Sequence, residues 1–242
     1  MSRPVAWVTG ASSGIGAALV TTCPWSGARL IGLSRRPPPP PAEHLALDLA
    51  DPSSWTIAAA SFADAVATER PDRVVLFHAA GTLDPIGFAG RVDSNAYTAG
   101  VLLNSAAPQV LGHVFLAATV EVGRRHLVLL TSGAATTVYP GTSSYGAAKA
   151  AADQWVRTVG AEQSGVGIGT GAQVLAVAPG TVATSMQDQL RAAPEADFPP
   201  RQRFRDLLRD GQLSDPDEVA IRLWALLDGD LKTGSVVDLR HI

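Results

Sequence analysis

The stretch VTGASSGIG, residues 8–16, follows a short apolar segment and opens a segment with helical character. Gly10 permits a sharp turn, Gly14 lets the backbone approach a bound group where a Cβ would intrude, and Gly16 lets the helix pack closely on the strand. The free N–H groups at the helix start, with the positive end of the helix dipole, suit a pyrophosphate. Three glycines alone would fit an ordinary turn. Their position after the first strand of a βαβ unit predicts a dinucleotide site, with a glycine spacing different from G-x-G-x-x-G.

Apolar segments alternate with helical ones along the rest of the chain. We expect strands at residues 5–8, 29–33, 44–47, 73–77, 126–130, 173–177 and 235–239, and helices at 15–22, 52–68, 94–104, 108–120, 143–161 and 217–227. Strands that are rich in Val and Leu and separated by helices indicate a parallel sheet that is buried on both faces. The sequence therefore predicts an α/β fold, a single doubly wound domain over residues 1–242 with seven strands.

Three stretches break this alternation. Five consecutive prolines at 37–41 cannot form a helix or a central strand, so we expect an exposed polyproline II spacer. A motif for a proline-recognising domain is the alternative. The glycine-rich stretch 164–172 is typical of a loop. Residues 184–213 are the least regular and contain three prolines, which favours a mobile lid over a substrate.

The composition of the 242 residues favours a sizeable core, since 46% are hydrophobic and 17% are charged. A net charge of −3 gives no electrostatic footprint for DNA or RNA, so we expect no nucleic-acid partner. The lone Cys23 excludes an intrachain disulfide framework and is expected to be a packed thiol. The N-terminus lacks a signal-peptide pattern, and no window approaches about 18 uninterrupted apolar residues. We expect a cytoplasmic protein with no membrane partner and no metal site.

The end of the second strand selects between the two nicotinamide cofactors. An acidic residue there would bind the ribose diol of NAD, but this chain has Ser34, Arg35 and Arg36. A hydroxyl and a guanidinium can bind a 2′-phosphate through charge-assisted hydrogen bonds, which predicts NADPH, with Arg35 the better contact. The alternative is a pair of solvated loop arginines.

The stretch after the third strand offers contacts to an adenine. Asp48 can accept a hydrogen bond from the adenine amino group, with Leu49 beside the ring. The alternative is that Asp48 or Asp51 caps the next helix, and Asp51, directly before Pro52, fits that role better.

Tyr145 and Lys149 lie one helical turn apart in SSYGAAKAA, residues 143–151, on one face of the predicted helix. A phenol with a pKa near ~10 exchanges protons poorly at neutral pH. A neighbouring ammonium stabilises the phenolate, and a drop of ~3 units corresponds to about 4 kcal/mol. The pair therefore predicts a general acid, its small neighbours leaving room for a cofactor ring. The alternative is a surface tyrosine beside a solvated lysine.

Two further side chains are placed to assist. Ser132 ends the fifth strand, where its hydroxyl can orient a substrate carbonyl, while alternation points Thr131 to the other face. Asn104 sits in a helix interior, where asparagine is a mediocre choice. A kinked turn there could hold a water that links Lys149 to bulk solvent, and the alternative is a satisfied helix amide.

Together these residues resemble the short-chain dehydrogenase/reductase family. Thr9-Gly10-x-x-x-Gly14-Ile15-Gly16 is similar to its cofactor motif, and Asn104, Ser132, Tyr145 and Lys149 are similar to its catalytic tetrad. The resemblance implies a single-domain Rossmann fold with strand order 3-2-1-4-5-6-7. It implies cofactor contacts from Gly10, Ser12, Ser13, Gly14, Ile15, Ser34, Arg35, Arg36, Asp48, Leu49, Ala79, Ala80, Gly81, Tyr145, Lys149, Pro179, Gly180, Val182 and Thr184.

Within that family, the stretches at 81–87, 132–153, 184–187 and 211–220 most resemble the sepiapterin reductase and benzil reductase group, which reduces vicinal dicarbonyls with NADPH. One departure stands out, because the family usually has Asn-Asn-Ala-Gly after the fourth strand and this chain has His78-Ala79-Ala80-Gly81. The lost amides put stability or cofactor affinity in question. We expect His78 to be a buried structural histidine.

The resemblance implies a reductase in which hydride passes from NADPH to a carbonyl carbon while Tyr145 protonates the oxygen. Substrate walls are expected from Ser132, Val138, Tyr139, Tyr145, Met186 and Gln187. Alanine-rich 147–159 and the helix at 108–120 favour a homodimer or homotetramer. The alternatives are an alcohol dehydrogenase or a 3-oxoacyl or steroid reductase of the same family, and a non-catalytic NADP-sensing module.

Overall fold

The chain folds around a parallel sheet of seven strands. The computed structural model describes residues 3–165 and 171–242. The sheet order β3-β2-β1-β4-β5-β6-β7 confirms the predicted doubly wound α/β topology. The strands are β1 (Val5–Thr9), β2 (Arg29–Ser34), β3 (Glu43–Ala46), β4 (Arg73–His78), β5 (Arg124–Leu130), β6 (Gln173–Ala178) and β7 (Val236–Asp238).

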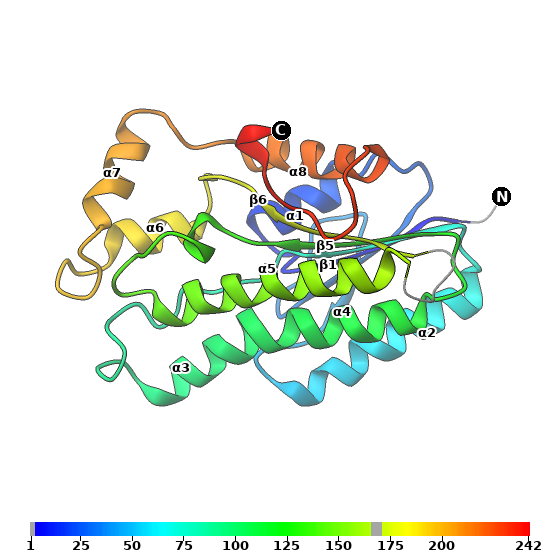
Figure 1. The fold of residues 1–242 in the computed structure, drawn as a ribbon, viewed down its shortest axis with the longest axis horizontal. Coiled ribbons are helices and arrows are strands. Elements are labelled where there is room, and N and C mark those ends of the chain that lie inside the picture. Colours follow the sequence, from blue (N-terminus) through cyan, green and yellow to red (C-terminus); the bar gives the residue numbers. More distant parts are fainter. Residues whose placement is uncertain (1–2, 166–170) are drawn as a thin grey trace.

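Helices cover both faces of this sheet (Figure 1). On one face lie α2, α4 and α5, and on the other lie α1 and α8. The helices are α1 (Gly14–Thr21), α2 (Trp55–Glu69), α3 (Ser94–Val101), α4 (Ala107–Ala118), α5 (Ser143–Gln163), α6 (Ser185–Ala192), α7 (Arg201–Arg209) and α8 (Pro216–Ala225). A π-helical turn, Leu102–Ala106, joins α3 to α4 in one continuous rod.

Alternation along β1 divides the core into two layers. Trp7 points to the α2 and α4 face and meets Phe62 and Phe115 edge-on, with ring centroids 5.2 and 6.0 Å away. Ala6 and Val8 point to the other face, toward the layer that contains Trp224. Because β1 is buried on both sides, its sequence is almost entirely apolar, and the residues at the middle of β4, β5 and β6 are apolar for the same reason.

Cys23 packs partly against the second layer, and burial raises the pKa of its thiol. This is the packed thiol that the sequence predicts.

The stretch 184–213 is more regular than the sequence predicts. It contains α6 and α7, which extend beyond the edge where β1, β4, β5 and β6 end (Figure 1). Both helices are short, and their apolar residues pack in a small third cluster with Tyr145 rather than on the sheet. This cluster consists of Leu83, Tyr145, Leu190, Ala193, Phe198 and Phe204.

The proline run is also less exposed than predicted. Pro38 and Pro39 are half-buried, and Pro38 packs so closely over Gly32 that a Cβ there would lie 2.8 Å from its Cγ. The N–H of Ala42 donates to the carbonyl of Pro39, so a turn ends the run. The prolines therefore fold back on the end of β2 instead of forming a free polyproline II spacer. The predicted loop 164–172 lies partly outside the described residues.

The helical rod Ser94–Ala118 is long and apolar enough, by length and composition, to cross a membrane, although the sequence predicted no such segment. About a third of its most apolar window is buried, and α4 packs against α2 and α5. A helix at the core of a folded domain passes the same test. The absence of a membrane partner stays a prediction.

Candidate active site

The glycine turn lies where the end of β1 meets the loop after β4. Gly10 has φ +66°, and a Cβ on it would lie 2.8 Å from the Cα of Ala80. The N–H of Ala80 donates to Thr9 Oγ1 at 3.1 Å, which ties the two loops together. A Cβ on Gly16 would lie 2.2 Å from the carbonyl oxygen of Gly10. Glycine is therefore required at both ends of the turn.

Two adjoining cavities open at this edge of the sheet. The first, which we call the glycine-turn cleft, has a volume of about 330 Å³ and contains the turn, the end of β2 and the loop after β3. The second, the tyrosine pocket, has a volume of about 230 Å³ and contains Tyr145. They share the lining residues Ile15, Ala79, Ala80, Gly81, Thr184 and Met186.

Every predicted cofactor residue lines one of the two cavities. The glycine-turn cleft has Gly10, Ser12, Ser13, Gly14, Ile15, Ser34, Arg35, Arg36, Asp48, Leu49, Ala79, Ala80, Gly81 and Thr184. The tyrosine pocket adds Tyr145, Lys149, Pro179, Gly180 and Val182. A cradle from which Cβ atoms are excluded, followed by two arginines, fits a dinucleotide that carries phosphates.

At the end of β2, the groups available to a phosphate are the two guanidinium groups. Ser34 is buried, and its hydroxyl donates to the carbonyl oxygen of Arg36 at 2.7 Å, so its proton is already used. A hydrogen bond from the Ser34 hydroxyl to the cofactor stays a prediction, and it would require this bond to Arg36 to be exchanged. Arg35 and Arg36 are exposed, and among the described residues neither has a side-chain hydrogen bond or ion pair.

The loop after β3 uses its carboxylates for local structure. Asp48 Oδ1 accepts the N–H of Ala50 at 3.0 Å, and Asp51 accepts the N–H of Ser53 at 2.9 Å. The second contact is the predicted N-cap, at the 3-10 turn that precedes α2. Leu49 is buried and lines the cleft beside Asp48.

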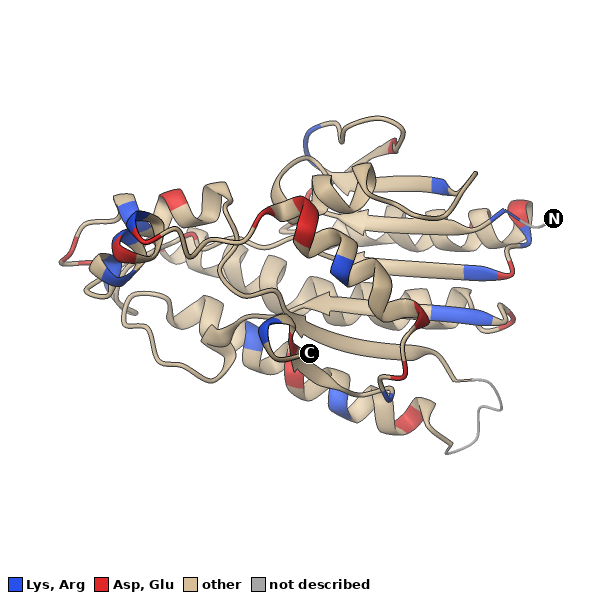
Figure 2. Ribbon diagram, turned by 90° about the horizontal axis from the view of Figure 1, so that it is seen from above, with Lys and Arg blue, Asp and Glu red and all other residues tan. Residues whose placement is uncertain are grey.

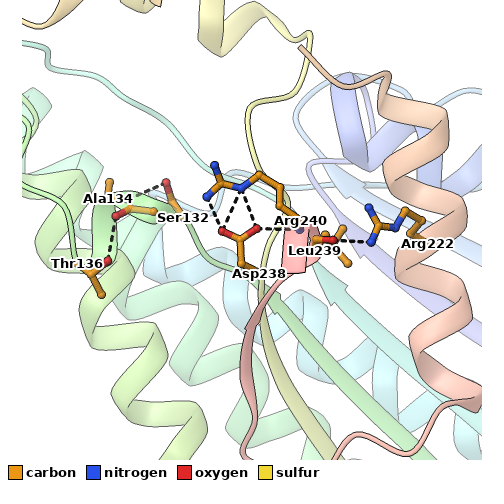
Figure 3. A network of polar contacts seen from close by, with 8 residues as sticks. Ser132, Ala134, Thr136, Arg222, Asp238, Leu239 and Arg240 are labelled. Carbon is orange, nitrogen blue, oxygen red and sulfur yellow. Dashed lines mark hydrogen bonds and ion pairs between the residues drawn. The ribbon is translucent and has the colours of Figure 1, made fainter. Parts of the chain in front are cut away.

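Tyr145 stands in the first turn of α5, and its hydroxyl lies near that of Ser132, which follows the end of β5; both residues line the tyrosine pocket. Ser132 is held in place because its Oγ accepts the N–H of Ala134 at 3.1 Å (Figure 3). Burial raises the pKa of Tyr145, and the nearby Ser132 hydroxyl lowers it by less. The lowering of this pKa that the sequence predicts from Lys149 is therefore wrong for the cofactor-free protein, because desolvation of the phenol outweighs it.

Lys149 lies one turn further along α5 and is buried. Its Nζ donates to the carbonyl of Leu130 at 2.7 Å and lies 5.5 Å from the centroid of the Tyr145 ring. Burial lowers the pKa of Lys149 to about 8, and the charge of Asp153 raises it by less. The ammonium is thus held at the end of β5 by a neutral carbonyl.

Asn104 lies in the π-helical turn, the kink that its position in a helix predicts, and it lines neither cavity. Its Oδ1 accepts the N–H of Thr82 at 2.9 Å, and its Nδ2 donates to the carbonyl of Thr82 at 2.8 Å. The amide therefore braces the loop that follows β4. The water relay to Lys149 stays a prediction.

His78 ends β4 and is buried, as predicted. Neither ring nitrogen has a hydrogen-bond partner among the described residues. Burial lowers the pKa of His78 to about 3, and the charge of Lys149 adds to this effect. The ring is thus neutral at physiological pH and lines neither cavity.

Most of the residues expected as substrate walls line the tyrosine pocket, and their contact with a substrate stays a prediction. Tyr139, Met186 and Gln187 line the tyrosine pocket together with Ser132 and Tyr145. Val138 does not, because its side chain is 87% exposed and faces a separate surface hollow beside Ala147. Sequence reasoning missed the walls contributed by the loop after β4, by α6 and α7 and by the C-terminus, which are Leu83, Leu190, Phe198, Arg203, Phe204 and Arg240.

The comparisons with known proteins agree with this geometry. The family described as short chain dehydrogenase matches residues 4–195. The chain belongs to the short-chain dehydrogenase family. It is thus an oxidoreductase of that family.

Individual relatives span almost the whole chain. Benzil reductase ((S)-benzoin forming) of Bacillus subtilis (strain 168) is 30% identical, over 97% of both chains. Galactitol 2-dehydrogenase (L-tagatose-forming) of Cereibacter sphaeroides is 31% identical, over 88% of this chain and 83% of its own. A solved structure described as a putative NAD(P) dependent gluconate 5-dehydrogenase from Beutenbergia cavernae, with bound NADP, has a TM-score of 0.76 and 24% identity, covering 98% and 95% of the two chains.

The buried ammonium of Lys149 makes folding stability depend on pH. Its pKa is lower in the folded chain than in the unfolded one, so the unfolded state binds more protons between the two pKa values, and stability rises with pH there. We predict that Lys149→Met unfolds at higher urea than the wild type near neutral pH. The amount by which the unfolding free energy of Lys149→Met exceeds that of the wild type is expected to be about 2 kcal/mol smaller at about pH 9.5 than at about pH 7. A gap that stays constant or widens over this range contradicts the buried charge.

Proposed function

We propose that this chain reduces a vicinal dicarbonyl with NADPH, one carbonyl becoming a hydroxyl. The observation that carries the proposal is that Tyr145 and Ser132 lie together in a pocket that adjoins the glycine-turn cleft. The Bacillus relative, similar over the whole chain, is named for the reduction of benzil, which supports a diketone as the substrate.

In this proposal the chain positions one carbonyl and supplies its proton. Bound NADPH supplies the hydride that adds to the carbonyl carbon. The Ser132 hydroxyl orients the carbonyl oxygen, and the Tyr145 phenol gives that oxygen its proton. Burial favours this role, because the raised pKa of Tyr145 keeps the phenol protonated at neutral pH before the reaction. Lys149, with one donor engaged by Leu130, keeps donors for the cofactor ribose and stabilises the phenolate that remains.

NADPH rather than NADH is proposed from the charges at the end of β2. Arg35 and Arg36 are exposed at the glycine-turn cleft, where a 2′-phosphate would be the group to pair with them. The gluconate 5-dehydrogenase structure that shares this fold holds NADP. Asp48 and Leu49, which line the same cleft, are proposed as the adenine contacts.

Three further features of the protein belong to the same proposal. Residues 184–213 form a lid whose apolar residues pack around Tyr145. Asn104 supports a water that returns a proton toward Lys149. Exposed Val110 on α4 and Val120 in the turn that follows it, with the exposed alanines of α5, support association of copies into a dimer or tetramer.

A second candidate is oxidation of an alcohol by the same residues in the reverse direction. It is favoured by the similarity to galactitol 2-dehydrogenase over 88% of this chain. Tyr145, as the phenolate, would then accept the alcohol proton while Ser132 orients the alcohol oxygen, and the hydride would pass to the oxidised cofactor.

A carbonyl panel tests the proposed function. We expect the purified protein to consume NADPH with benzil and with an aliphatic vicinal diketone faster than with a matched simple ketone, and to use NADH poorly. Consumption is followed by the loss of nicotinamide absorbance, with galactitol and NADP⁺ or NAD⁺ as the reverse assay. Oxidation of galactitol without reduction of any diketone would favour the second candidate, and no turnover in either direction would favour a sensor.

Cofactor choice is tested by substitution at the end of β2. We expect Arg35→Gln to raise the KM for NADPH about tenfold, the size of one lost charge-assisted hydrogen bond, and to leave the KM for NADH nearly constant. Arg91→Gln, which removes an arginine that lines neither cavity, is the matched control. An equal rise for both cofactors would show that Arg35 does not read the 2′-phosphate.

A further inference from the structure

Two arginines line the tyrosine pocket, and no acidic side chain lines it within the part of the chain that the structure describes. Arg203 comes from α7 and Arg240 from the 3-10 turn Leu239–His241 at the C-terminus. Among the described residues that line this pocket, Lys149 is the only other charged one. The charge that this pocket presents to a ligand is therefore positive. Figure 2 shows α7 as a helix that carries both signs of charge.

The two arginines differ in how they are held. Arg240 is fixed by a bidentate ion pair with Asp238, and its carbon stem packs on Gly180, so that a Cβ on that glycine would lie 3.2 Å from Arg240 Cδ. Figure 3 shows its side chain extending from the C-terminal turn toward the strand end that carries Ser132. Arg222 anchors the turn by donating to the carbonyl of Leu239.

Arg203 has no ion pair and no side-chain hydrogen bond within residues 3–165 and 171–242. Its guanidinium lies 5.7 Å from the centroid of the Tyr139 ring, a cation–π position that holds the head group over an aromatic wall. The neighbouring Phe204 is buried against Tyr139, with centroids 5.7 Å apart. The five donors of Arg203 are thus held at the pocket and remain free.

The tyrosine pocket combines apolar walls with the Arg203 guanidinium, which lies over the Tyr139 ring and has no acceptor among the described residues. Such a pocket is suited to a ligand with an apolar body and a carboxylate. The body would contact Leu83, Tyr139, Leu190 and the two phenylalanines at 198 and 204. The planar guanidinium of Arg203 would donate two parallel hydrogen bonds to the two oxygens of a carboxylate. Arg203 is exposed, so beside a neutral diketone its guanidinium would hydrogen-bond only to water.

We propose that Arg203 is a specificity-determining residue that binds a carboxylate on the substrate, remote from the reacting carbonyl, with Arg240 adding positive potential. The proposal rests on the proposed function, because it names the class of dicarbonyl that the tyrosine pocket takes. That class is an apolar or aromatic ketone or diketone that ends in a carboxylate.

A matched substrate pair tests this inference. The pair is 4-carboxybenzil and its methyl ester, which share the dicarbonyl and differ in one charge. The readout is the ratio of kcat/KM for the acid to that for the ester, measured with NADPH. We expect this acid-to-ester ratio to be about tenfold lower for Arg203→Gln than for the wild type, and lower still for Arg203→Glu. Raising NaCl from about 20 mM to about 500 mM should reduce the wild-type ratio, since salt screens exposed charges.

Arg209→Gln is the control, because it removes one arginine from the same helix at a position outside the pocket. We expect it to keep the wild-type ratio. A wild-type preference for the ester, or an acid-to-ester ratio that Arg203→Gln leaves unchanged, overturns the inference even where benzil itself is reduced. An equal loss for acid and ester would assign Arg203 only to the support of Tyr139 and also overturns it.

Calorimetry separates this inference from the proposed function. With NADP⁺ present no hydride is available, so 4-carboxybenzil can bind without reacting. Wild-type protein should bind the acid about tenfold more tightly than Arg203→Gln does, whether or not it turns over any dicarbonyl. Equal affinities, or no binding by the wild type, contradict the inference independently of activity.

Discussion

The buried hydrogen bond from Lys149 Nζ to the carbonyl of Leu130 is the contact on which the site depends. It joins the second turn of α5 to the end of β5, so that Tyr145, one turn earlier, comes to lie beside Ser132, two residues past Leu130. The carbonyl of Leu130 ends β5 and accepts the hydrogen bond of the Lys149 ammonium, and this carbonyl carries no negative charge. The arrangement therefore fixes the Tyr145 phenol, the Ser132 hydroxyl and the Lys149 ammonium relative to one another before any ligand binds.

Burial has opposite effects on the two ionisable groups of this arrangement. It raises the pKa of the Tyr145 phenol and lowers that of the Lys149 ammonium to about 8, because in each case the charged form loses solvation. The protein before cofactor binding is thus set to keep the tyrosine protonated, the state that a proton donor needs. Helical spacing indicates the attraction between the Tyr145 phenolate and the Lys149 ammonium, but it does not indicate the larger effect of desolvation on the phenol. It consequently gave the wrong direction for the pKa of Tyr145.

The central fold and the order of its elements could be predicted because their physical causes are local. Trp7 and its neighbours are apolar on both faces of β1, and Gly10 and Gly16 have no room for a Cβ. Predictions failed where a long-range contact decides the structure. Short helices α6 and α7 are stabilised by packing around Tyr145, and Pro38 folds onto Gly32. The direction of Val138 and the position of Arg240 depend on loops whose course no periodicity encodes.

The proton from Tyr145 is the central claim, and Tyr145→Phe tests it most directly, because the substitution removes the hydroxyl and keeps the ring. Turnover of benzil is measured beside the affinity for NADPH, which is followed by nicotinamide fluorescence, with circular dichroism to verify the fold. The account predicts that kcat falls by about 10²–10⁴-fold, as for other lost general acids, while NADPH still binds with an affinity within about twofold of the wild type. A variant that keeps a kcat near that of the wild type would contradict it.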